Sequence, residues 1–295
     1  MKGNSNRERT SACVQSWRTG ISGISDRRAG CGFIESESGS IHHGHGLWDR
    51  SRCLSTAREL EGLHVLRPIP ALIFPAQCRL CRTPLSDGPD LCPGCLHDLP
   101  WLEATCVHCA RPLAQAGGPV ACGACQRSTP GFDAATALLH YRPPADYLVQ
   151  RFKFAGELAL APLLAGLLAT KIAARPARLP GLLVPVPLHP SRLRERGFNQ
   201  ATELARVLGR RLGLSVNHRL CQRIKRTEPQ STLPVKQRHD NLRNAFTVSG
   251  RPAAGHIAIV DDVMTSGHTA GELARVLKQA GARRVEVWVI ARAGH

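Results

Sequence analysis

Residues 256–269 read HIAIVDDVMTSGHT, and this stretch decides the fold. Its opening, residues 256–261, is a short apolar run with β-branched side chains, which is typical of a buried strand. Downstream, Leu273, Val276 and Leu277 recur at helical spacing. The stretch is therefore predicted to be the turn between a strand and a helix, and in α/β folds such turns bind phosphates and nucleotides.

Two adjacent carboxylates, Asp261 and Asp262, precede a run of small and hydroxylated residues. The backbone N–H groups of a tight loop that opens a helix attract an anion, and the helix dipole adds about 0.3–1 kcal/mol at exposed sites. A phosphate would repel the carboxylates, so we expect them to accept hydrogen bonds from hydroxyl groups such as those of a ribose. The alternative is a strand end with helix-capping residues, although capping needs only one Asp or Thr. We assign phosphate binding to the phosphate loop, which consists of Thr265, Ser266, Gly267, His268 and Thr269.

This pattern resembles the loop that binds 5-phosphoribosyl 1-pyrophosphate (PRPP) in type I phosphoribosyltransferases. The resemblance implies that PRPP, or another phosphoribosyl ligand, binds here together with Mg²⁺, and that Asp261 and Asp262 belong to the catalytic site. It also implies an α/β fold of the type I phosphoribosyltransferase kind, in which a parallel sheet carries helices on both faces.

Three further blocks of sequence resemble one family. They are YLVQRFKFAGE at residues 147–157, VPVPLHPSRLRERGFNQATELARVL at residues 184–208 and RTEPQSTLPVKQRHDNLRNAF at residues 226–246. Together with a preceding cysteine-rich segment they are similar to the ComF family, also called competence protein F or GntX-type proteins, over roughly residues 70–293. The resemblance implies a role in DNA uptake or utilisation during natural transformation, with proteins of the DNA-uptake machinery as partners.

The block at residues 184–208 supplies candidate pyrophosphate contacts. By resemblance, Val186 and Pro187 correspond to the loop that meets pyrophosphate in phosphoribosyltransferases, and a cis peptide bond at this turn stays open. Arg194 and Arg196 follow in a predicted flexible loop, and guanidinium groups match phosphate oxygens with paired hydrogen bonds. Arginines on a solvated surface are the alternative interpretation. Lys153 is a further candidate for a phosphate contact.

Eight of the 12 cysteines form four Cys-x-x-Cys pairs. Two thiolates at this spacing point at one tetrahedral ion, so two pairs complete a closed structural zinc site. Because CRLCRTPL (78–85) is echoed by CVHCARPL (106–113), we predict that the first four cysteines bind one Zn²⁺ and the last four another. Interleaved pairing, disulfides, and a His97 or His108 ligand are the alternatives. The pairs are Cys78/Cys81, Cys92/Cys95, Cys106/Cys109 and Cys122/Cys125.

Composition and periodicity predict three regions. Residues 1–64 are rich in Ser, Gly and Arg and are expected to be a disordered or dispensable extension. Residues 65–131 are the predicted double zinc ribbon, and residues 132–295 are the predicted phosphoribosyltransferase-like domain. Within that domain, helices are expected near residues 144–174 and 199–213, and strands at residues 135–141, 182–187, 257–261 and 285–291.

Most of the positive charge lies in the last region. The chain has a formal net charge of +17, and residues 133–295 contain 25 Lys/Arg and 11 Asp/Glu. Residues 192–243 contain 13 Lys/Arg and 4 Asp/Glu, which is more than one pyrophosphate requires. Single-stranded DNA is the expected second anion, bound along its phosphates, because Phe198 and Phe246 are the only aromatic residues in or beside that segment. A basic surface that serves solubility alone is the alternative.

No stretch approaches the ~20 apolar residues that span a bilayer, and the N-terminus lacks the apolar core of a secretory signal. We therefore expect no membrane insertion and a cytoplasmic location. Two functions are consistent with these patterns. In the first, the protein binds PRPP, Mg²⁺ and single-stranded DNA and acts in DNA uptake or utilisation. In the second, it is an active phosphoribosyltransferase of nucleotide metabolism, with electrostatic catalysis and an acceptor that the sequence does not name.

Overall fold

The computed structural model describes residues 76–85, 90–114, 120–225 and 244–294. The extension expected at residues 1–64 and most of the sequence block at 226–246 lie outside these described residues. In the described part of the chain, no helix is both long and apolar enough to cross a membrane.

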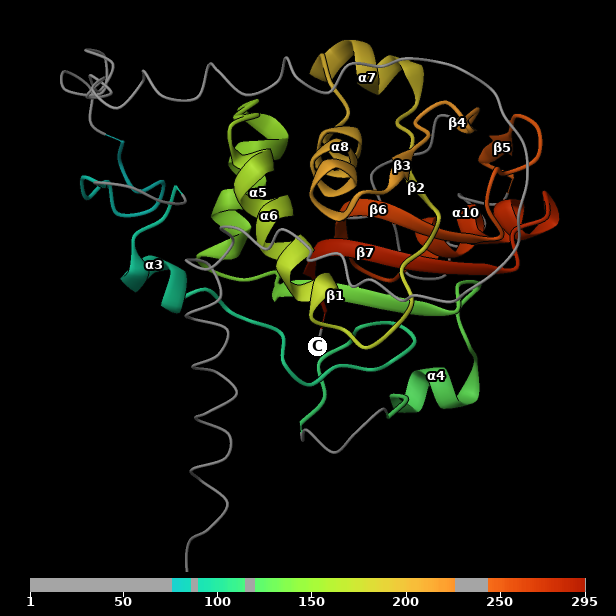
Figure 1. Ribbon diagram of the computed structural model, residues 1–295, viewed down its shortest axis with the longest axis horizontal. Helices are drawn as coiled ribbons and strands as arrows, with labels where there is room; N and C mark the ends of the chain where they lie inside the picture. Colours follow the sequence, from blue (N-terminus) through green and yellow to red (C-terminus); the bar gives the residue numbers. More distant parts are fainter. Residues whose placement is uncertain (1–75, 86–89, 115–119, 226–243, 295) are drawn as a thin grey trace, which may run out of the picture. The chain divides into compact units, whose positions relative to one another are not determined.

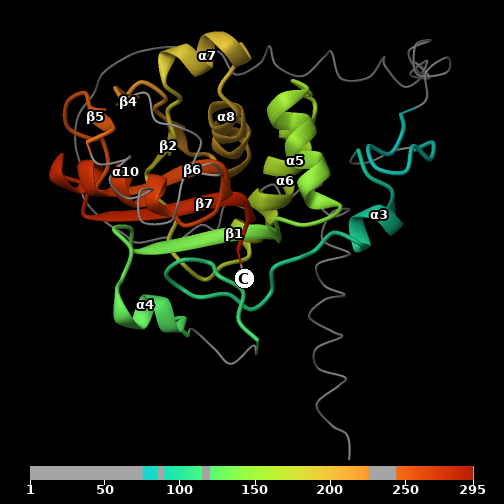
Figure 2. The ribbon, with the colours of Figure 1, turned by 180° about the vertical axis from the view of Figure 1, so that it is seen from behind.

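A five-stranded parallel sheet forms the centre of the α/β domain (Figure 1). Its strands lie in the order β1-β7-β6-β2-β3, and every neighbouring pair is parallel. The strands β1, β7, β6 and β2 can be followed from behind in Figure 2. The strands are β1 (Ala134–His140), β7 (Arg284–Arg292), β6 (His256–Met264), β2 (Leu182–Pro185) and β3 (Ser215–Val216), and a separate antiparallel pair consists of β4 (Cys221–Arg223) and β5 (Phe246–Val248).

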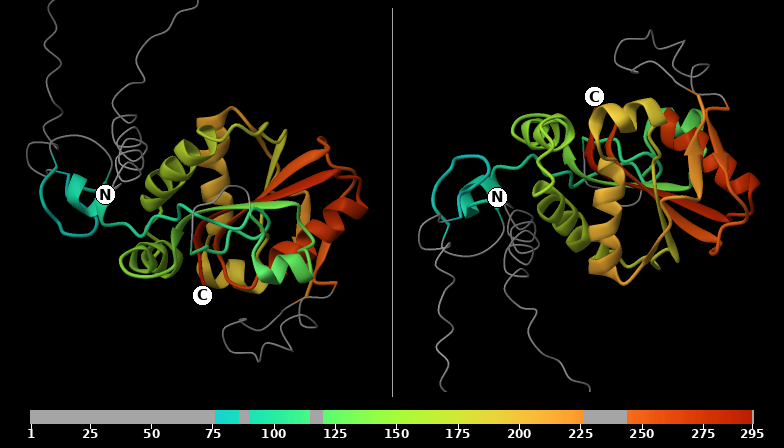
Figure 3. Two further views of the ribbon diagram at one scale, coloured as in Figure 1. Left: turned by 90° about the horizontal axis from the view of Figure 1, so that it is seen from below. Right: turned by 90° about the horizontal axis from the view of Figure 1, so that it is seen from above.

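Helices cover both faces of the sheet (Figure 3). Along β6, Ala258 and Val260 pack with residues of α5, α6 and α8, whereas Ile257 and Ile259 pack with α10. Successive side chains of a strand point to opposite faces, so a strand covered on both sides needs an apolar residue at every position. The helices are α5 (Ala145–Phe154), α6 (Leu160–Ala173), α7 (Pro190–Arg196), α8 (Gln200–Leu212) and α10 (His268–Gln279), with two short helices, α3 (Pro93–His97) and α4 (Gly123–Arg127), in the cysteine-rich segment.

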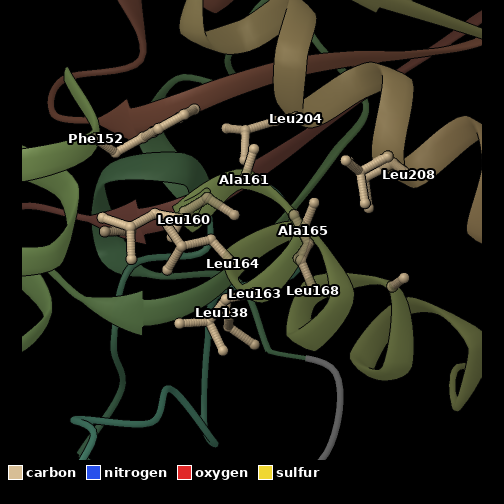
Figure 4. Packing of buried hydrophobic residues seen from close by; sticks show 14 of the residues in the cluster. Leu138, Phe152, Leu160, Ala161, Leu163, Leu164, Ala165, Leu168, Leu204 and Leu208 are labelled. Atoms are coloured by element: carbon tan, nitrogen blue, oxygen red, sulfur yellow. The ribbon is translucent and has the colours of Figure 1, made fainter. Parts of the chain in front are cut away.

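Helices α6 and α8 pack against each other in the core on one face of the sheet (Figure 4). Leu160, Leu164 and Leu168 of α6 pack in one cluster with Leu204 and Leu208 of α8, and all five are fully buried. Burying one such side chain stabilises the fold by about 1.5–3 kcal/mol. This layer holds α5 and α8 in place on the sheet, and both helices carry residues of the site described below.

The predicted parallel sheet with helices on both faces is confirmed, but one strand boundary was wrong. The helical region expected near residues 144–174 consists of α5 and α6. The strand expected to end at Asp261 continues to Met264, because Val263 and Met264 still pair with β7. Asp261 and Asp262 therefore lie inside a central strand and precede its end.

The predicted flexible loop with Arg194 and Arg196 is a helix, α7. Pro190 occupies its first turn, where proline is tolerated because the N–H there has no helical partner. The helix ends at Gly197, whose φ of 81° is the left-handed conformation that favours glycine. Both arginines are therefore held on a rigid element. Among the described residues the one cis peptide bond is Pro143–Pro144, so the turn at residues 184–187 is trans.

Candidate functional site

Two groups of four cysteines are assembled in the described residues. Within each group the sulfur atoms lie within 4.8 Å of one another. Four thiolates converging on one point are the donor set of a closed structural zinc site. The grouping is the one predicted from the internal repeat and differs from the interleaved alternative. The first group is Cys78, Cys81, Cys92 and Cys95, and the second group is Cys106, Cys109, Cys122 and Cys125.

The two groups are built on the same backbone turn. In the first group the N–H of Arg82 donates to the carbonyl of Cys78 at 2.9 Å, and in the second the N–H of Ala110 donates to that of Cys106 at 2.9 Å. Both donors have a left-handed backbone, with φ of 63° and 52°. The later cysteine pair of each group opens a short helix, α3 or α4. The sequence repeat is therefore also a structural repeat.

Backbone hydrogen bonds prepare one thiol of each group for metal binding. Although burial opposes ionisation, N–H donors lower the pKa of Cys78 to about 6. The same balance lowers the pKa of Cys106 to about 6. Since the thiolate is the metal-binding form, both groups fit zinc chemically as well as geometrically.

Disulfides and histidine ligands do not form either group. All nine described cysteines are free thiols, and the sulfur atoms of Cys81 and Cys92 are 3.6 Å apart, compared with about 2.05 Å in a disulfide. His97 Nδ1 lies 3.1 Å from a carboxylate oxygen of Asp98. His108 Nδ1 lies 3.2 Å from a backbone carbonyl, and neither histidine belongs to a four-thiol group.

The phosphate loop connects β6 to α10 at the carboxyl end of β6, which is the middle strand of the sheet. Thr265 and Ser266 are exposed, and α10 begins at His268. Gly267 caps the helix with a φ of 82°, a left-handed conformation in which a side chain would be strained. The structure therefore brings the loop residues together at the N-terminus of a 12-residue helix, where the dipole favours an anion.

The two carboxylates occupy successive positions of β6 and serve different faces of the sheet. Asp262 lies on the side of α5, α6 and α8 and is 2% exposed. Its Oδ2 atom is 3.0 Å from Nζ of Lys153, a residue in the last turn of α5. Because successive side chains of a strand point to opposite faces, Asp261 lies on the side of α10. Its Oδ1 atom accepts a hydrogen bond from the N–H of Asp262 at 2.9 Å.

The electrostatics of the pair are unusual for carboxylates. Burial and the negative charge of Asp262 raise the pKa of Asp261 to about 7, and the positive charge of Lys153 opposes this. A charged carboxylate next to Asp261 makes the ionisation of Asp261 less favourable. Near neutral pH, Asp261 therefore ionises less readily than an ordinary aspartate.

Of the two predicted arginines, only Arg196 faces the carboxylates. Arg194 is exposed, whereas Arg196 is partly buried and donates from Nη1 to Oε1 of Gln200 at 2.7 Å. Its guanidinium carbon is 5.4 Å from the ring centroid of Phe154. Burial lowers the pKa of Arg196, and the negative charge of Asp262 opposes that effect. The structure therefore separates two residues that the sequence treated alike.

The predicted pyrophosphate turn lies beside the carboxylates because β2 is the neighbour of β6. Val186 and Pro187 are buried at the carboxyl end of β2, and the N–H of Val186 donates to Val260 at 2.9 Å. Nδ2 of Asn199 donates to the carbonyl of Val186 at 3.0 Å. The chain leaves β2 toward β3 and leaves β6 toward β7, in opposite directions along the sheet. Ligands of open α/β sheets bind at such a switch point.

Two basic residues lie beside the carboxylates for reasons that the sequence does not show. Lys153, predicted as a candidate phosphate contact, pairs with Asp262 across 109 residues of sequence. Arg223 of β4 was not singled out; burial and the charge of Arg192 lower its pKa, and the charge of Asp261 opposes this. The order of strands and helices is what brings these residues together, and no local pattern carries that signal.

Known proteins with similar sequences support this description. The fold and the site define a double zinc ribbon joined to a parallel α/β domain. Residues 69–126 match the family described as "Double zinc ribbon domain". Competence protein F of Haemophilus influenzae is 34% identical over 228 residues, which cover 75% of this chain and 98% of that protein. DNA utilization protein YhgH of Escherichia coli K12 is 33% identical over 226 residues, covering 75% and 99%. The chain therefore belongs to the ComF family.

More distant similarity is also present. Competence protein ComFC of Streptococcus pneumoniae is 28% identical over 159 residues, covering 53% of this chain and 67% of that protein. The crystal structure of a purine phosphoribosyltransferase from Pyrococcus horikoshii matches 54% of this chain and 87% of its own, with a TM-score of 0.27 and 15% identity.

We expect the protein to bind two zinc ions per chain, one in each four-cysteine group. Cys81→Ser combined with Cys95→Ser should reduce the zinc content to one, because two of four ligands are lost from the first group. Cys221→Ser should leave it unchanged, since Cys221 is a buried free thiol outside both groups. Elemental analysis measures the content. Equal zinc loss in the double variant and in Cys221→Ser would contradict the assignment.

We expect Asp261 to contribute a decrease in the free energy of unfolding as pH rises from about 4 to about 7. The pKa of Asp261 is raised in the folded protein, so over this range its carboxyl binds more protons in the folded state than in the unfolded state and this contribution to stability is lost with rising pH. The contribution is at most about 1.4 kcal/mol per pH unit. Denaturant unfolding at a series of pH values should show a shallower decrease in Asp261→Asn. The exposed control Asp98→Asn should retain the wild-type dependence, and identical curves for all three proteins are the contrary result.

Proposed function

We propose that this chain binds PRPP with Mg²⁺ where β6 meets α10, binds single-stranded DNA beside that site, and acts in DNA uptake or utilisation. The observation that carries the first part is the pair Asp261–Asp262 followed at once by a helix-opening loop at the switch point of the sheet. The relatives named competence protein F and DNA utilization protein support the second part. A cytoplasmic location and partners in the DNA-uptake machinery stay predictions.

The ligand would be held from two sides of the β6–α10 junction. Backbone N–H groups and hydroxyls of the phosphate loop suit the 5-phosphate, which the helix dipole also attracts. Asp261 and Asp262 suit the ribose hydroxyls, because a carboxylate accepts hydrogen bonds from such donors. Lys153 offsets part of the negative charge of the pair, so that an anionic ligand can approach carboxylates.

The pyrophosphate would lie toward the turn at Val186 and Pro187, with Arg196 and the exposed Arg194 as its basic partners. Mg²⁺ is usually held by one or two carboxylates together with substrate phosphates. Asp261 and Asp262 are the carboxylates of this site. Burial and, after it, the negative charge of Asp262 raise the pKa of Asp261 to about 7, and a bound cation would oppose both effects. The cation would supply charge neutralisation for the pyrophosphate.

A second candidate function, transfer of the phosphoribosyl group to an acceptor, is favoured by one observation. A general base is most effective when its pKa lies near the working pH, and burial raises the pKa of Asp261 to about 7. Release of pyrophosphate from PRPP in the presence of nucleobases would establish turnover. PRPP binding without release would leave ligand binding as the function.

The DNA surface that we propose lies on α5 beside the carboxylates. Tyr147, Arg151 and Phe154 occur at helical spacing on one face of α5, and Tyr147 and Phe154 are 44% and 72% exposed. The guanidinium of Arg151 is 5.5 Å from the ring centroid of Tyr147, and that of Arg196 is 5.4 Å from that of Phe154. Exposed rings alternating with arginines are what single-stranded nucleic acid needs, since bases stack on the rings and phosphates meet the cations.

This surface differs from the one expected from the sequence. Phe246 is 3% exposed, and Phe198 is partly buried with its ring centroid 6.1 Å from that of Phe152. Neither ring is available to stack on a base. The exposed rings belong to α5, outside the most basic segment, so the proposed DNA site combines stacking with contacts to phosphates.

We expect Asp261→Asn with Asp262→Asn to weaken PRPP binding by at least about tenfold, because hydrogen bonds to charged groups contribute about 1.5–3 kcal/mol each. Calorimetric titration with PRPP and Mg²⁺ measures the affinity. The exposed Asp98→Asn serves as the control, and circular dichroism verifies that the double variant is folded. Unchanged PRPP affinity in a folded double variant would refute the site.

We expect Phe154→Ala to weaken binding of a short single-stranded oligonucleotide by roughly 5- to 150-fold, because stacking of one base contributes about 1–3 kcal/mol. Phe154→Trp should retain the affinity, since it keeps an aromatic face. Fluorescence anisotropy at several salt concentrations measures both, and the salt dependence should be preserved in Phe154→Ala but reduced in Arg151→Gln. The exposed apolar control Ile224→Ala should bind normally. If Phe154→Ala binds as tightly as the control, the surface on α5 is not the DNA site.

A further inference from the structure

Arg292, the last residue of β7, makes hydrogen bonds to two segments that are far apart in the sequence. The residue is 4% exposed. Its Nε atom donates to the backbone carbonyl of Cys109 at 2.9 Å. Its Nη1 atom donates to the carbonyl of Met264 at 3.1 Å and to that of Thr265. Cys109 belongs to the second four-cysteine group and Thr265 begins the phosphate loop, so one guanidinium joins the two.

Strand register places Arg292 at this position. Met264 is the partner of Arg292 in the pairing of β6 with β7, and the N–H of Ala293 donates to Met264 at 2.9 Å. The phosphate loop therefore leaves the sheet directly beside Arg292. The carbonyl of Thr265 is the first one after the end of β6, and the strand pairing gives it no backbone partner on β7. The guanidinium of Arg292 donates a hydrogen bond to this carbonyl instead.

The second four-cysteine group lies against the buried guanidinium of Arg292, which donates a hydrogen bond from Nε to the backbone carbonyl of Cys109. A zinc ion bound by four thiolates retains a net negative charge. Removing one partner of a buried charge is costly, so Arg292 depends on this group for its position.

Close packing connects the same two segments. Phe132 follows the second group and is 2% exposed, and its ring would lie 3.6 Å from a Cβ placed on Gly267 of the phosphate loop. A Cβ placed on Gly131 would lie 2.7 Å from the carbonyl oxygen of Gly271, in the first turn of α10. The chain that leaves the second group therefore rests on the loop and on the start of its helix.

The first four-cysteine group packs elsewhere. Cys78 and Leu91 belong to the cluster that contains α5 and α6, whereas Phe132 and Met264 belong to the cluster on the opposite face. The two groups are alike in their ligands and in their turns, and they differ in what they contact. The chain therefore contains its own matched control for any effect of zinc on the phosphate loop.

We propose that the second zinc site holds the phosphate loop in its ligand-binding conformation through Arg292, so that zinc at this site increases the affinity for the phosphoribosyl ligand. Arg292 is then a positioning residue, because it contacts the loop backbone and the zinc segment. The nature of the ligand rests on the proposed function, whereas the coupling of zinc to the loop does not.

Coupling between two binding sites is reciprocal. If zinc in the second group favours binding of PRPP, bound PRPP increases the affinity of that group for zinc by the same factor, and slower loss of that zinc to a chelator is the expected sign. Zinc in the first group should leave at the same rate with and without PRPP. If Arg292 only stabilised the fold, its substitution would change the rates of zinc release from both groups alike.

The test uses the full-length, zinc-loaded protein and three measurements: hydrogen exchange of residues 264–269 without ligand, calorimetric titration with PRPP and Mg²⁺, and zinc release to a chelator. Arg292→Met and Cys125→Ser should accelerate loop exchange and weaken PRPP binding by about fivefold or more. Arg292→Lys, which keeps the charge, should have a smaller effect. Cys95→Ser in the first group and the exposed Arg210→Met should leave the loop unchanged.

Equal loop exchange in Cys95→Ser and Cys125→Ser would overturn the proposal. Wild-type loop exchange in Arg292→Met would also overturn it. If Arg292→Met does not fold, wild-type loop exchange in both Arg292→Lys and Cys125→Ser would overturn it. Loss of the PRPP effect on zinc release in Arg292→Met, with zinc still bound, would support it. A wild-type protein that fails to bind PRPP refutes the proposed function, and the exchange measurement still decides the coupling.

Discussion

Burial of β6 on both faces is the constraint on which the rest of the structure depends. The strand lies between β7 and β2, with α5, α6 and α8 on one face and α10 on the other, so residues 257–260 must all be apolar. Charged side chains enter the strand only near its carboxyl end, at Asp261 and Asp262. Parallel pairing brings the ends of β2 and β7 to the same edge, and with them the turn at Val186 and the guanidinium of Arg292.

Placing two carboxylates at the end of a covered strand creates an electrostatic problem that distant residues resolve. Alternation sends Asp262 toward α5, where Lys153 pairs with it, and Asp261 toward the other face, where Arg223 opposes its charge. Arg196 adds a third positive charge from α7. The pair remains under-neutralised, which is why burial and repulsion raise the pKa of Asp261. Such an imbalance is common where a site binds a ligand, since stability alone would favour neutral residues there.

The two zinc sites of the cysteine-rich segment have different neighbours in the fold. Each group closes a turn that contains few apolar side chains, and metal binding contributes folding energy that such a small core cannot supply. The first group is attached to the cluster on the α5 and α6 face through Cys78 and Leu91. The second is attached to the opposite face, next to the phosphate loop. A repeat of one motif thus gives two sites with different neighbours.

The features that the sequence determined are those encoded within a few residues. A continuous run of apolar residues specifies β6, a glycine with hydroxylated neighbours specifies the turn into α10, and the repeated Cys-x-x-Cys pairs specify the grouping of the ligands. The ranking of residues that looked equivalent was decided by the tertiary structure alone: Arg196 but not Arg194 faces the carboxylates, and Phe154 but not Phe246 is exposed. The same holds for Lys153 beside Asp262 and for Arg292 between the zinc segment and the loop. Burial and ion pairing depend on which strands and helices become neighbours, and that arrangement is set by packing across the whole domain.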